Sequence, residues 1–144
     1  MLETITLQGR IFAVVMRANY SASGIYFFTP PDFSQQLAYM QHPRGKIIEP
    51  HIHNPVSREV HYTQEVLFIR KGRLRVDFYD ESHNYLESRV LGAGDVILLA
   101  SGGHGFEVLE EIEMIEVKQG PYAGDADKTK FSSVSASQII FPEK

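Results

Sequence analysis

Apolar and polar residues alternate along much of this chain, and turn residues interrupt the alternation at short intervals. The alternation is strictest in residues 74–79, where apolar residues at every second position are separated by charged ones. A period of two places successive side chains on opposite faces of a strand, so this segment predicts a strand with one face in water. Residues 65–70 form an apolar run directly before it. Lys71-Gly72 between the two runs predicts a tight hairpin turn.

The same signals predict about ten short strands, separated by turns rich in glycine, proline, asparagine and aspartate. Besides the hairpin, the predicted strands are residues 4–8, 11–16, 24–29, 35–41, 46–53, 86–91, 96–99, 106–109 and 112–118. The last two form a second hairpin across Glu110-Glu111. No segment shows a convincing helical period. This combination predicts an all-β fold, either a sandwich or a barrel.

Length and composition limit the architecture. A chain of 144 residues without cysteine fits one domain that buries its own core without disulfides. No repeat or linker divides residues 1–144. We expect residues 119–144, which are rich in Gly, Asp, Lys and Ser, to form a C-terminal tail that packs on the barrel and docks again through the apolar residues 139–141.

Charge and hydropathy argue against two classes of partner. Fourteen basic residues against eighteen acidic residues give a formal net charge of -4, and the basic residues are scattered, so we expect no nucleic acid partner. The N-terminus lacks the basic and apolar regions of a signal peptide, and no apolar run is long enough to span a membrane. We therefore expect a soluble, cytoplasmic protein with no membrane partner.

Three histidines and a glutamate carry the candidate chemistry. His51 and His53 are two residues apart, so on a strand their imidazoles point to the same side, within reach of one metal ion. Glu65 opens the first arm of the predicted hairpin, and His104 follows the glycine-bearing turn at 101–103. Imidazole and carboxylate ligands suit zinc, iron, manganese or nickel. We therefore expect these four side chains to converge on one divalent metal ion inside the barrel.

The spacing of these residues resembles the first motif of the cupins. In that motif a glycine and a His-x-His pair are followed by a glutamate and a second glycine. Here Gly45 is separated by five residues from the pair His51 and His53, and Glu65 by six residues from Gly72, and both spacings match the family.

A second cupin-like motif lies further along the chain. Gly94-Asp95 is followed by the apolar strand 96–100, the turn 101–103 and His104. The resemblance covers about residues 35–118. It implies a single-domain cupin double-stranded β-helix, which is a jelly-roll barrel, with one divalent metal ion (Zn, Fe, Mn or Ni) held by the four side chains named above.

Two features depart from the cupin pattern. The gap between His53 and Glu65 holds eleven residues, more than the family uses, and it contains Glu59 as a rival carboxylate ligand. Glu65 shares its parity with Leu67 and Ile69, so it should face the same interior, which favours Glu65 over Glu59. A Ser-Gly-Gly turn also replaces the usual Pro-x-Gly before the last histidine, which affects the shape of the turn more than ligation.

Several other side chains have two interpretations each. Glu116 and Lys118 lie on one face of the last predicted strand, where they would line the barrel mouth or form a solvated ion pair. Arg58 and Tyr62, in the inserted segment, would form a lid over the metal or cover a partner subunit. Four strand residues would line the pocket or belong to the core: Tyr26, Phe28, Tyr39 and Gln41. The remaining histidines, which sit in turn-like contexts and suit core or rim positions, are His42, His61 and His83.

The expected function follows from the resemblance. The leading hypothesis is a metal-binding cupin that acts on a small polar metabolite. Residues 116–122, Glu-Val-Lys-Gln-Gly-Pro-Tyr, look like small cupins of carbohydrate or surface-polysaccharide metabolism, which points to a sugar or polysaccharide precursor. One alternative is a non-enzymatic ligand-binding or sensor cupin. Another is a metal-independent sugar-nucleotide epimerase or ketoisomerase, in which His104 or His51 acts with Tyr62 as acid and base. One barrel supports many chemistries, so no catalytic residue is assigned.

Exposed strand edges need a cover, and many small cupins provide it by dimerising. We expect the N-terminal strands, residues 4–8 and 11–16, to pair across a two-fold axis in a homodimer. The predicted partners are therefore a small-molecule ligand and a second copy of this chain.

Overall fold

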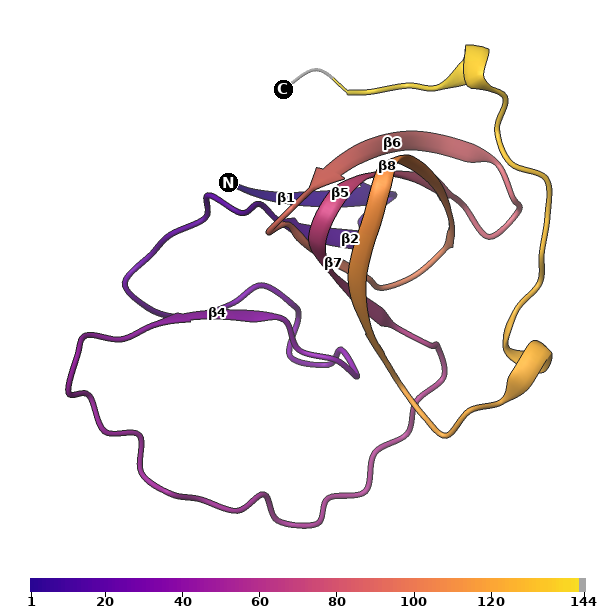
Figure 1. Ribbon diagram of the computed structural model, residues 1–144. Coiled ribbons are helices and arrows are strands. Elements are labelled where there is room, and N and C mark those ends of the chain that lie inside the picture. The colour runs from indigo at the N-terminus through magenta and orange to yellow at the C-terminus, as the bar shows by residue number, and fades with distance from the viewer. Residues whose placement is uncertain (143–144) are drawn as a thin grey trace.

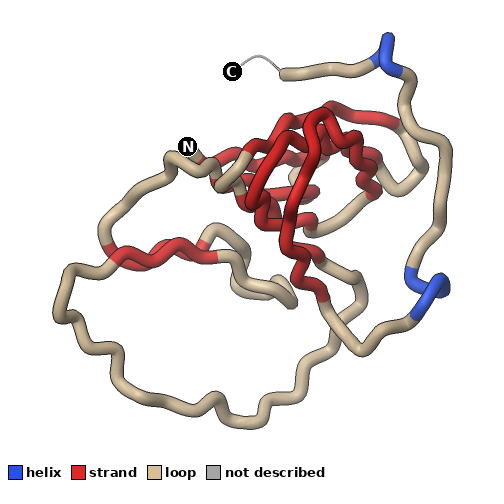
Figure 2. Tube along the Cα trace, in the orientation of Figure 1, coloured by secondary structure: helices blue, strands red, loops and turns tan. Residues whose placement is uncertain are grey.

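Strands make up nearly all of the regular structure in residues 1–142, the part of the chain that the computed structural model describes (Figure 1, Figure 2). In chain order the elements are β1 (Leu2–Leu7), β2 (Arg10–Met16), β3 (Gly24–Phe27), β4 (Ala38–Gln41), β5 (Glu65–Tyr79), β6 (Tyr85–Gly92), β7 (Val96–Leu99), β8 (Gly103–Lys118), η1 (Gly124–Asp127) and η2 (Ala136–Gln138). The predicted all-β fold is confirmed. Within the described residues, no helix is long and apolar enough to cross a lipid bilayer.

One curled sheet contains six strands. Its order is β1-β2-β7-β5-β6, and β8 pairs with β5 as well. β5 is antiparallel to its three neighbours: its first residues pair with β7, its second half with β6 and nearly its whole length with β8. Figure 1 shows that the sheet bends into a half-barrel, which is the barrel-like architecture expected. β3 and β4 form a separate two-stranded sheet.

The core is built from apolar residues of the curled sheet. Its buried members are Ile5, Phe12, Ala13, Val15, Leu67, Ile69, Leu74, Val76, Phe78, Leu91, Ile97 and Leu99. The β5 residues that belong to this core change parity, from odd numbers before Gly72 to even numbers after it. The ladder with β8 shifts register between Ile69 and Leu74. These bulges let both halves of β5 turn apolar side chains toward the same core.

The two predicted hairpin turns are wrong, because each lies inside one long strand. Lys71-Gly72 falls within the 15 residues of β5, and Glu110-Glu111 falls within the 16 residues of β8. Gly72 has φ +83, and a Cβ there would lie 2.0 Å from the carbonyl oxygen of Glu111. A glycine with positive φ suits a bulge as well as a turn, and pairing with β8 selects the bulge here.

The strand predicted at residues 46–53 is also wrong. Residues 42–64 contain no helix or strand, and nearly all of their side chains are exposed. Figure 1 shows this stretch as a wide loop from β4 to β5 that stays away from the curled sheet. A strand needs a neighbour for its backbone hydrogen bonds, and residues 46–53 have no neighbouring strand among the described residues.

The tail after β8 contacts the curled sheet at two places. The hydroxyl of Tyr79 accepts a hydrogen bond from the backbone N–H of Val134 at 3.0 Å. The N–H of Ser88 donates to the carbonyl of Ile140 at 2.8 Å, and the N–H of Ile140 donates to the hydroxyl of Tyr85 at 2.8 Å. These contacts hold residues 134–140 against β5 and β6.

Candidate functional site

The centre of the candidate site is a contact between Glu65 and His104. Glu65 is the first residue of β5, and His104 is the second residue of β8. Nε2 of His104 lies 3.2 Å from Oε2 of Glu65. Leu99 of β7 pairs with Glu65, and the chain reaches His104 through the short turn that follows β7. The strand order and the curl together therefore bring the two side chains into contact.

The Glu65 carboxylate is largely shielded from water. Its side chain is 10% exposed, against 28% for the imidazole of His104. The hydrogen bond from His104 holds the pKa of Glu65 below its ordinary value. Burial opposes this lowering, and the nearby charges of Lys128 and Lys118 add to it. Glu65 is therefore an ionised acceptor that orients the ring of His104.

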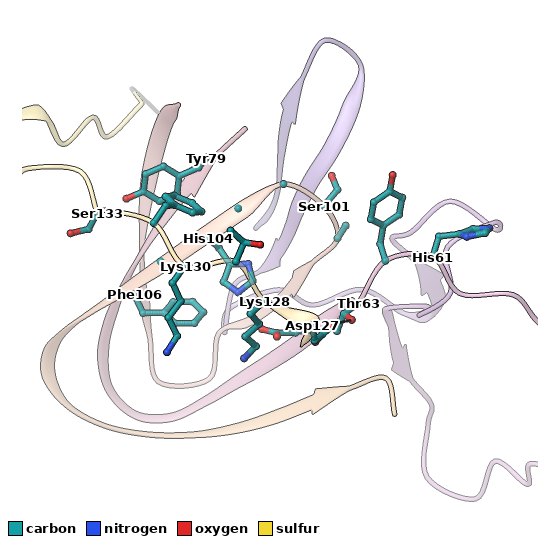
Figure 3. A pocket seen from close by; sticks show the side chains of 18 residues that line it. His61, Thr63, Tyr79, Ser101, His104, Phe106, Asp127, Lys128, Lys130 and Ser133 are labelled. Atoms are coloured by element: carbon teal, nitrogen blue, oxygen red, sulfur yellow. Dashed lines mark hydrogen bonds and ion pairs between the residues drawn. The ribbon is translucent and has the colours of Figure 1, made fainter. Parts of the chain in front are cut away.

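An open pocket of about 670 Å³ surrounds this pair (Figure 3). Its walls come from the ends of β5 and β8, from the residues just before β5, and from the tail. The tail contributes Lys128 and Lys130, which bring positive charge, and Phe131. Tyr79 and Phe106 add aromatic surface from the sheet. Such a mixture of apolar surface with a few converging polar groups is typical of small-molecule sites.

His51 and His53 lie outside this pocket, on the exposed loop between β4 and β5. Their ring centroids are 5.3 Å apart, and the rings are nearly perpendicular at 78°. Nδ1 of His51 lies 3.0 Å from the carbonyl oxygen of Glu49. The structure therefore brings His51 next to His53, and Glu65 next to His104, as two separate pairs.

The rival carboxylate belongs to neither pair. Glu59 is exposed, and among the described residues the one basic side chain within 4.0 Å of its carboxylate is His61, with Oε1 and Nε2 3.7 Å apart. Glu65, and not Glu59, is the carboxylate that contacts His104.

The donor set in a single chain does not complete a metal site. Within residues 1–142, no group of three or more His, Asp or Glu side chains is placed to hold a metal ion. A protein-bound zinc or iron ion uses at least three protein ligands in most sites. Glu65 and His104 supply two, so this conformation of one chain does not fit the four-ligand site that the motifs imply.

The other predicted residues divide between the pocket and the surface. Glu116 and Lys118 form an ion pair, with Nζ of Lys118 3.4 Å from Oε1 of Glu116, and neither lines the pocket around His104. Tyr62 lines the pocket, whereas Arg58 does not. The guanidinium of Arg10 lies 5.3 Å from the centre of the Tyr62 ring.

The aromatic residues of the small sheet form their own cluster. Tyr20 packs edge-on against Phe28 and Tyr39, with ring centroids 5.2 and 5.1 Å apart. Tyr26 is exposed, and Gln41 lies at the end of β4. None of these residues lines the pocket around His104.

The remaining histidines have separate environments. His61 lines the pocket. His83 stacks on Phe131, with ring centroids 4.2 Å apart and an interplanar angle of 4°. Nε2 of His42 is buried without a hydrogen-bond partner among the described residues.

Sequence reasoning missed the tail residues of the pocket. Lys128, Lys130 and Phe131 come from a segment whose composition suggested only a surface covering. Alternation of Lys128 and Lys130 is too short a pattern to predict a site, and only the path of the tail places them near His104.

Comparisons with known proteins add no assignment, since no protein-family model, no curated protein and no solved structure matches this chain. The described fold and site define an all-β protein with a half-barrel sheet and a polar pocket around a Glu–His pair. The resemblance to cupins rests on the motif spacing.

Proposed function

We propose that this protein is a cupin-type protein that acts on a small polar metabolite in the pocket around Glu65 and His104, together with one divalent metal ion (Zn, Fe, Mn or Ni). The observation that carries the proposal is the Glu65–His104 contact of 3.2 Å at the wall of an open pocket. Two of the four motif residues, distant in the chain, meet there.

The pocket chemistry supports an anionic, hydroxyl-rich ligand. Lys128 and Lys130 favour a phosphate or carboxylate group, and the hydroxyl of Tyr62 offers a further hydrogen bond. Phe106 supplies an apolar face for the carbon skeleton. A phosphorylated or acidic sugar, such as a polysaccharide precursor, combines these features.

The Glu65–His104 pair is suited to proton transfer. The Glu65 carboxylate accepts a hydrogen bond from Nε2 of His104, so Nδ1 is the ring nitrogen left to face a ligand. A His oriented in this way can take a proton from a bound ligand. The metal belongs to the proposal through the motif spacing, and no catalytic step is assigned to it because one chain brings only two of its donors together.

A second function uses the same pocket without a metal. Tyr62 and His104 both line it, which supports the epimerase or ketoisomerase hypothesis, with these two residues as acid and base. Apo protein that converts a sugar nucleotide after chelator treatment would favour this alternative. A sensor or binding module would bind the same ligands without turnover.

The test combines metal analysis with ligand binding. Elemental analysis of the purified protein should find about one divalent ion per chain. Calorimetry with glucose, glucose 1-phosphate and UDP-glucose should show preference for the phosphorylated ligands, and Glu65→Gln and His104→Gln should each weaken their binding at least about tenfold, or 1.4 kcal/mol.

Glu87→Gln is the matched control, since Glu87 pairs with Arg89 on β6 outside the pocket. This variant should bind like the wild type. Unchanged binding in both pocket variants would contradict the proposed site.

A homodimer and a cytoplasmic location complete the proposal. β1 and β2 pair with each other, and β1 is an end strand of the sheet order, so its outer edge could meet a second copy. The loop between β4 and β5 and the outer edge of β8 offer a more specific dimer interface.

A further inference from the structure

The loop between β4 and β5 exposes an apolar segment. The side chains of Ile47 and Ile52 are 78% and 87% exposed, and Ile48, Val56 and Val60 are exposed as well. Five large aliphatic side chains on one short exposed stretch are unusual for a monomer, where apolar patches stay small. This segment therefore has the character of a surface that another chain covers.

Contacts at both ends of the loop fix where it leaves the body. At one end, β4 pairs with β3. At the other, the N–H of Gln64 donates to the side-chain oxygen of Gln119 at 2.6 Å, and the side-chain oxygen of Gln64 accepts from the N–H of Gln35 at 3.0 Å. The part between these anchors stays away from its own sheet (Figure 1).

β8 presents the surface that such a segment needs. Among the described strands it pairs only with β5, so its other edge is free along 16 residues. Both of its faces expose apolar side chains, namely Phe106, Val108, Leu109, Met114, Ile115 and Val117. A long free edge with apolar faces is a template for a strand from another chain.

The solvent-accessible surface area of one chain is larger than that expected for a folded monomer and suits a subunit of a dimer. A folded monomer of 16.3 kDa should expose about 7,500 Å². This chain exposes 10120 Å², an excess of about 2,600 Å² over that expectation. Obligate homodimers bury about 2,000–5,000 Å² from both chains together, so an excess of this size on each chain suits an intertwined dimer.

Charge also favours the match. The loop carries three basic side chains, Arg44, Lys46 and Arg58, against two glutamates. β8 carries five glutamates and one lysine, and Glu113 has no ion pair among the described residues. The other four glutamates of β8 are paired with basic side chains of their own chain, so Glu113 is the carboxylate left to attract a basic side chain of the loop.

We propose that two copies of this chain exchange these loops, with residues 46–53 of each copy forming a strand on the free edge of the other copy's β8. The exchange places His51 and His53 of one chain beside Glu65 and His104 of the other. It gives residues 46–53 the neighbouring strand that they lack in the described part of one chain. The metal-binding part of this inference rests on the proposed function.

A strand at 46–53 fits the edge of β8. Eight residues span about 26 Å, half of the roughly 53 Å along the 16 residues of β8. Alternation puts His51 and His53 on one face and Ile48 and Ile52 on the other. Pro50, which has no N–H, is tolerated in an edge strand when its nitrogen faces solvent.

Mixing two inactive variants tests the exchange directly. One variant is H51A/H53A, and the other is E65Q/H104Q. Each alone should bind no Zn²⁺. After joint unfolding and refolding, about half of the dimers combine both variants, and each of these holds one complete site, so Zn²⁺ should return to about a quarter of an equivalent per chain. A site formed within one chain would recover none, and that result overturns the inference.

A second measurement does not depend on the metal. The chain lacks cysteine, so a short bismaleimide can join only introduced cysteines. It should link a His53→Cys chain to a His104→Cys chain of different mass, and light scattering should show a dimer at micromolar concentration. A monomer, or a cross-link found only within one doubly substituted chain, overturns the exchange.

Ile47→Asp together with Ile52→Asp should convert the dimer to monomer, whereas Tyr122→Ser, at an equally exposed position of the tail, should not. A dimer that persists in the double variant contradicts the assigned surface. Wild-type dimer without bound Zn²⁺ would remove the metal from the proposed function and leave the exchange supported by the cross-link.

Discussion

Glu65 and His104 are in contact although they belong to opposite ends of one strand ladder. In the β5–β8 ladder, Glu65 pairs with Lys118 and Phe78 pairs with His104. Thirteen residues of a flat strand would separate these ends by about 43 Å. The side chains are 3.2 Å apart because the sheet curls and brings its ends together. The site therefore depends on whatever maintains the curl.

The bulge at Gly72 is one such element, and Gly72→Ala tests it. An added Cβ would lie 2.0 Å from the carbonyl oxygen of Glu111, at a residue with φ +83. We expect a loss of at least about 2 kcal/mol in the free energy of unfolding, from the strained φ and the overlap with backbone. Urea denaturation measures this loss.

Gly45→Ala is the matched control for that substitution. Gly45 has φ +86, but nothing lies within 4 Å of a Cβ there. Its cost should stay near the roughly 1–2 kcal/mol of the strained φ alone. Equal losses in the two variants would show that the approach to Glu111 is unimportant.

A buried carboxylate on β5 stabilises the centre of the sheet. Asp77 is 3% exposed and accepts hydrogen bonds from Nε and Nη2 of Arg75, at 2.7 and 3.0 Å, and from the hydroxyl of Ser88. Asp77→Ala would leave Arg75 without its buried partner, so we expect a loss of about 3–5 kcal/mol in unfolding free energy. Thermal and chemical denaturation both report it.

Glu107→Gln serves as the control on the same arginine. Glu107 contacts Arg75 from the exposed side of β8. Its neutralisation should cost less than about 1 kcal/mol, as for other solvent-exposed ion pairs. A loss as large as that of Asp77→Ala would mean that burial is not the deciding factor.

Glu3 makes the stability of the fold depend on pH in the acidic range. Burial alone would raise its pKa, but hydrogen bonds and charges from Arg17 and Arg89 outweigh burial and hold the pKa below its ordinary value of 4.5. A carboxyl with a lowered folded-state pKa contributes stability above its ordinary pKa, and this contribution is lost as the pH falls through the lowered value. The wild type should therefore lose stability on acidification below about pH 4.5.

Glu3→Gln should lower the unfolding free energy at neutral pH by about 1–3 kcal/mol and remove part of this acid dependence. Urea titrations at several pH values compare the two proteins. If the unfolding free energies of the two proteins differ by the same amount from neutral to acidic pH, other groups cause the loss of stability in acid.

The lysines of the tail test the charge of the ligand. Lys128→Gln and Lys130→Gln should each weaken glucose 1-phosphate binding about tenfold, or 1.4 kcal/mol, and leave the binding of uncharged glucose unchanged. Lys71→Gln is the control, because Lys71 pairs with Glu111 away from the pocket, with Nζ 2.9 Å from Oε2. Equal effects on both sugars would argue against a phosphate subsite.

Local pattern was sufficient for much of the β structure. The alternation at 74–79 and the apolar run at 96–99 both lie in strands of the curled sheet, and residues 86–91 fall within β6. A period of two is a property of neighbouring residues, so it survives whatever the strand pairs with. The parity of Glu65 with Leu67 likewise predicted that its side chain turns inward, and it is buried.

The local sequence pattern did not predict features that depend on pairing between strands far apart in the chain. A glycine such as Gly72 is expected both in a turn and in a bulge. Pairing with β8, which comes later in the chain, determines that it forms a bulge. Residues 46–53 have the pattern of a strand but no partner strand within residues 1–142.

The sequence by itself therefore determined an all-β chain with alternating strands and with the residue types of a metal or acid–base site. Only the tertiary structure decided that β5 and β8 are long bulged strands, that Glu65 meets His104, and that Lys128 joins them from the tail. The physical reason is that side-chain direction is set by neighbouring residues, whereas curl, register and the path of the tail are set by contacts between segments far apart in the chain.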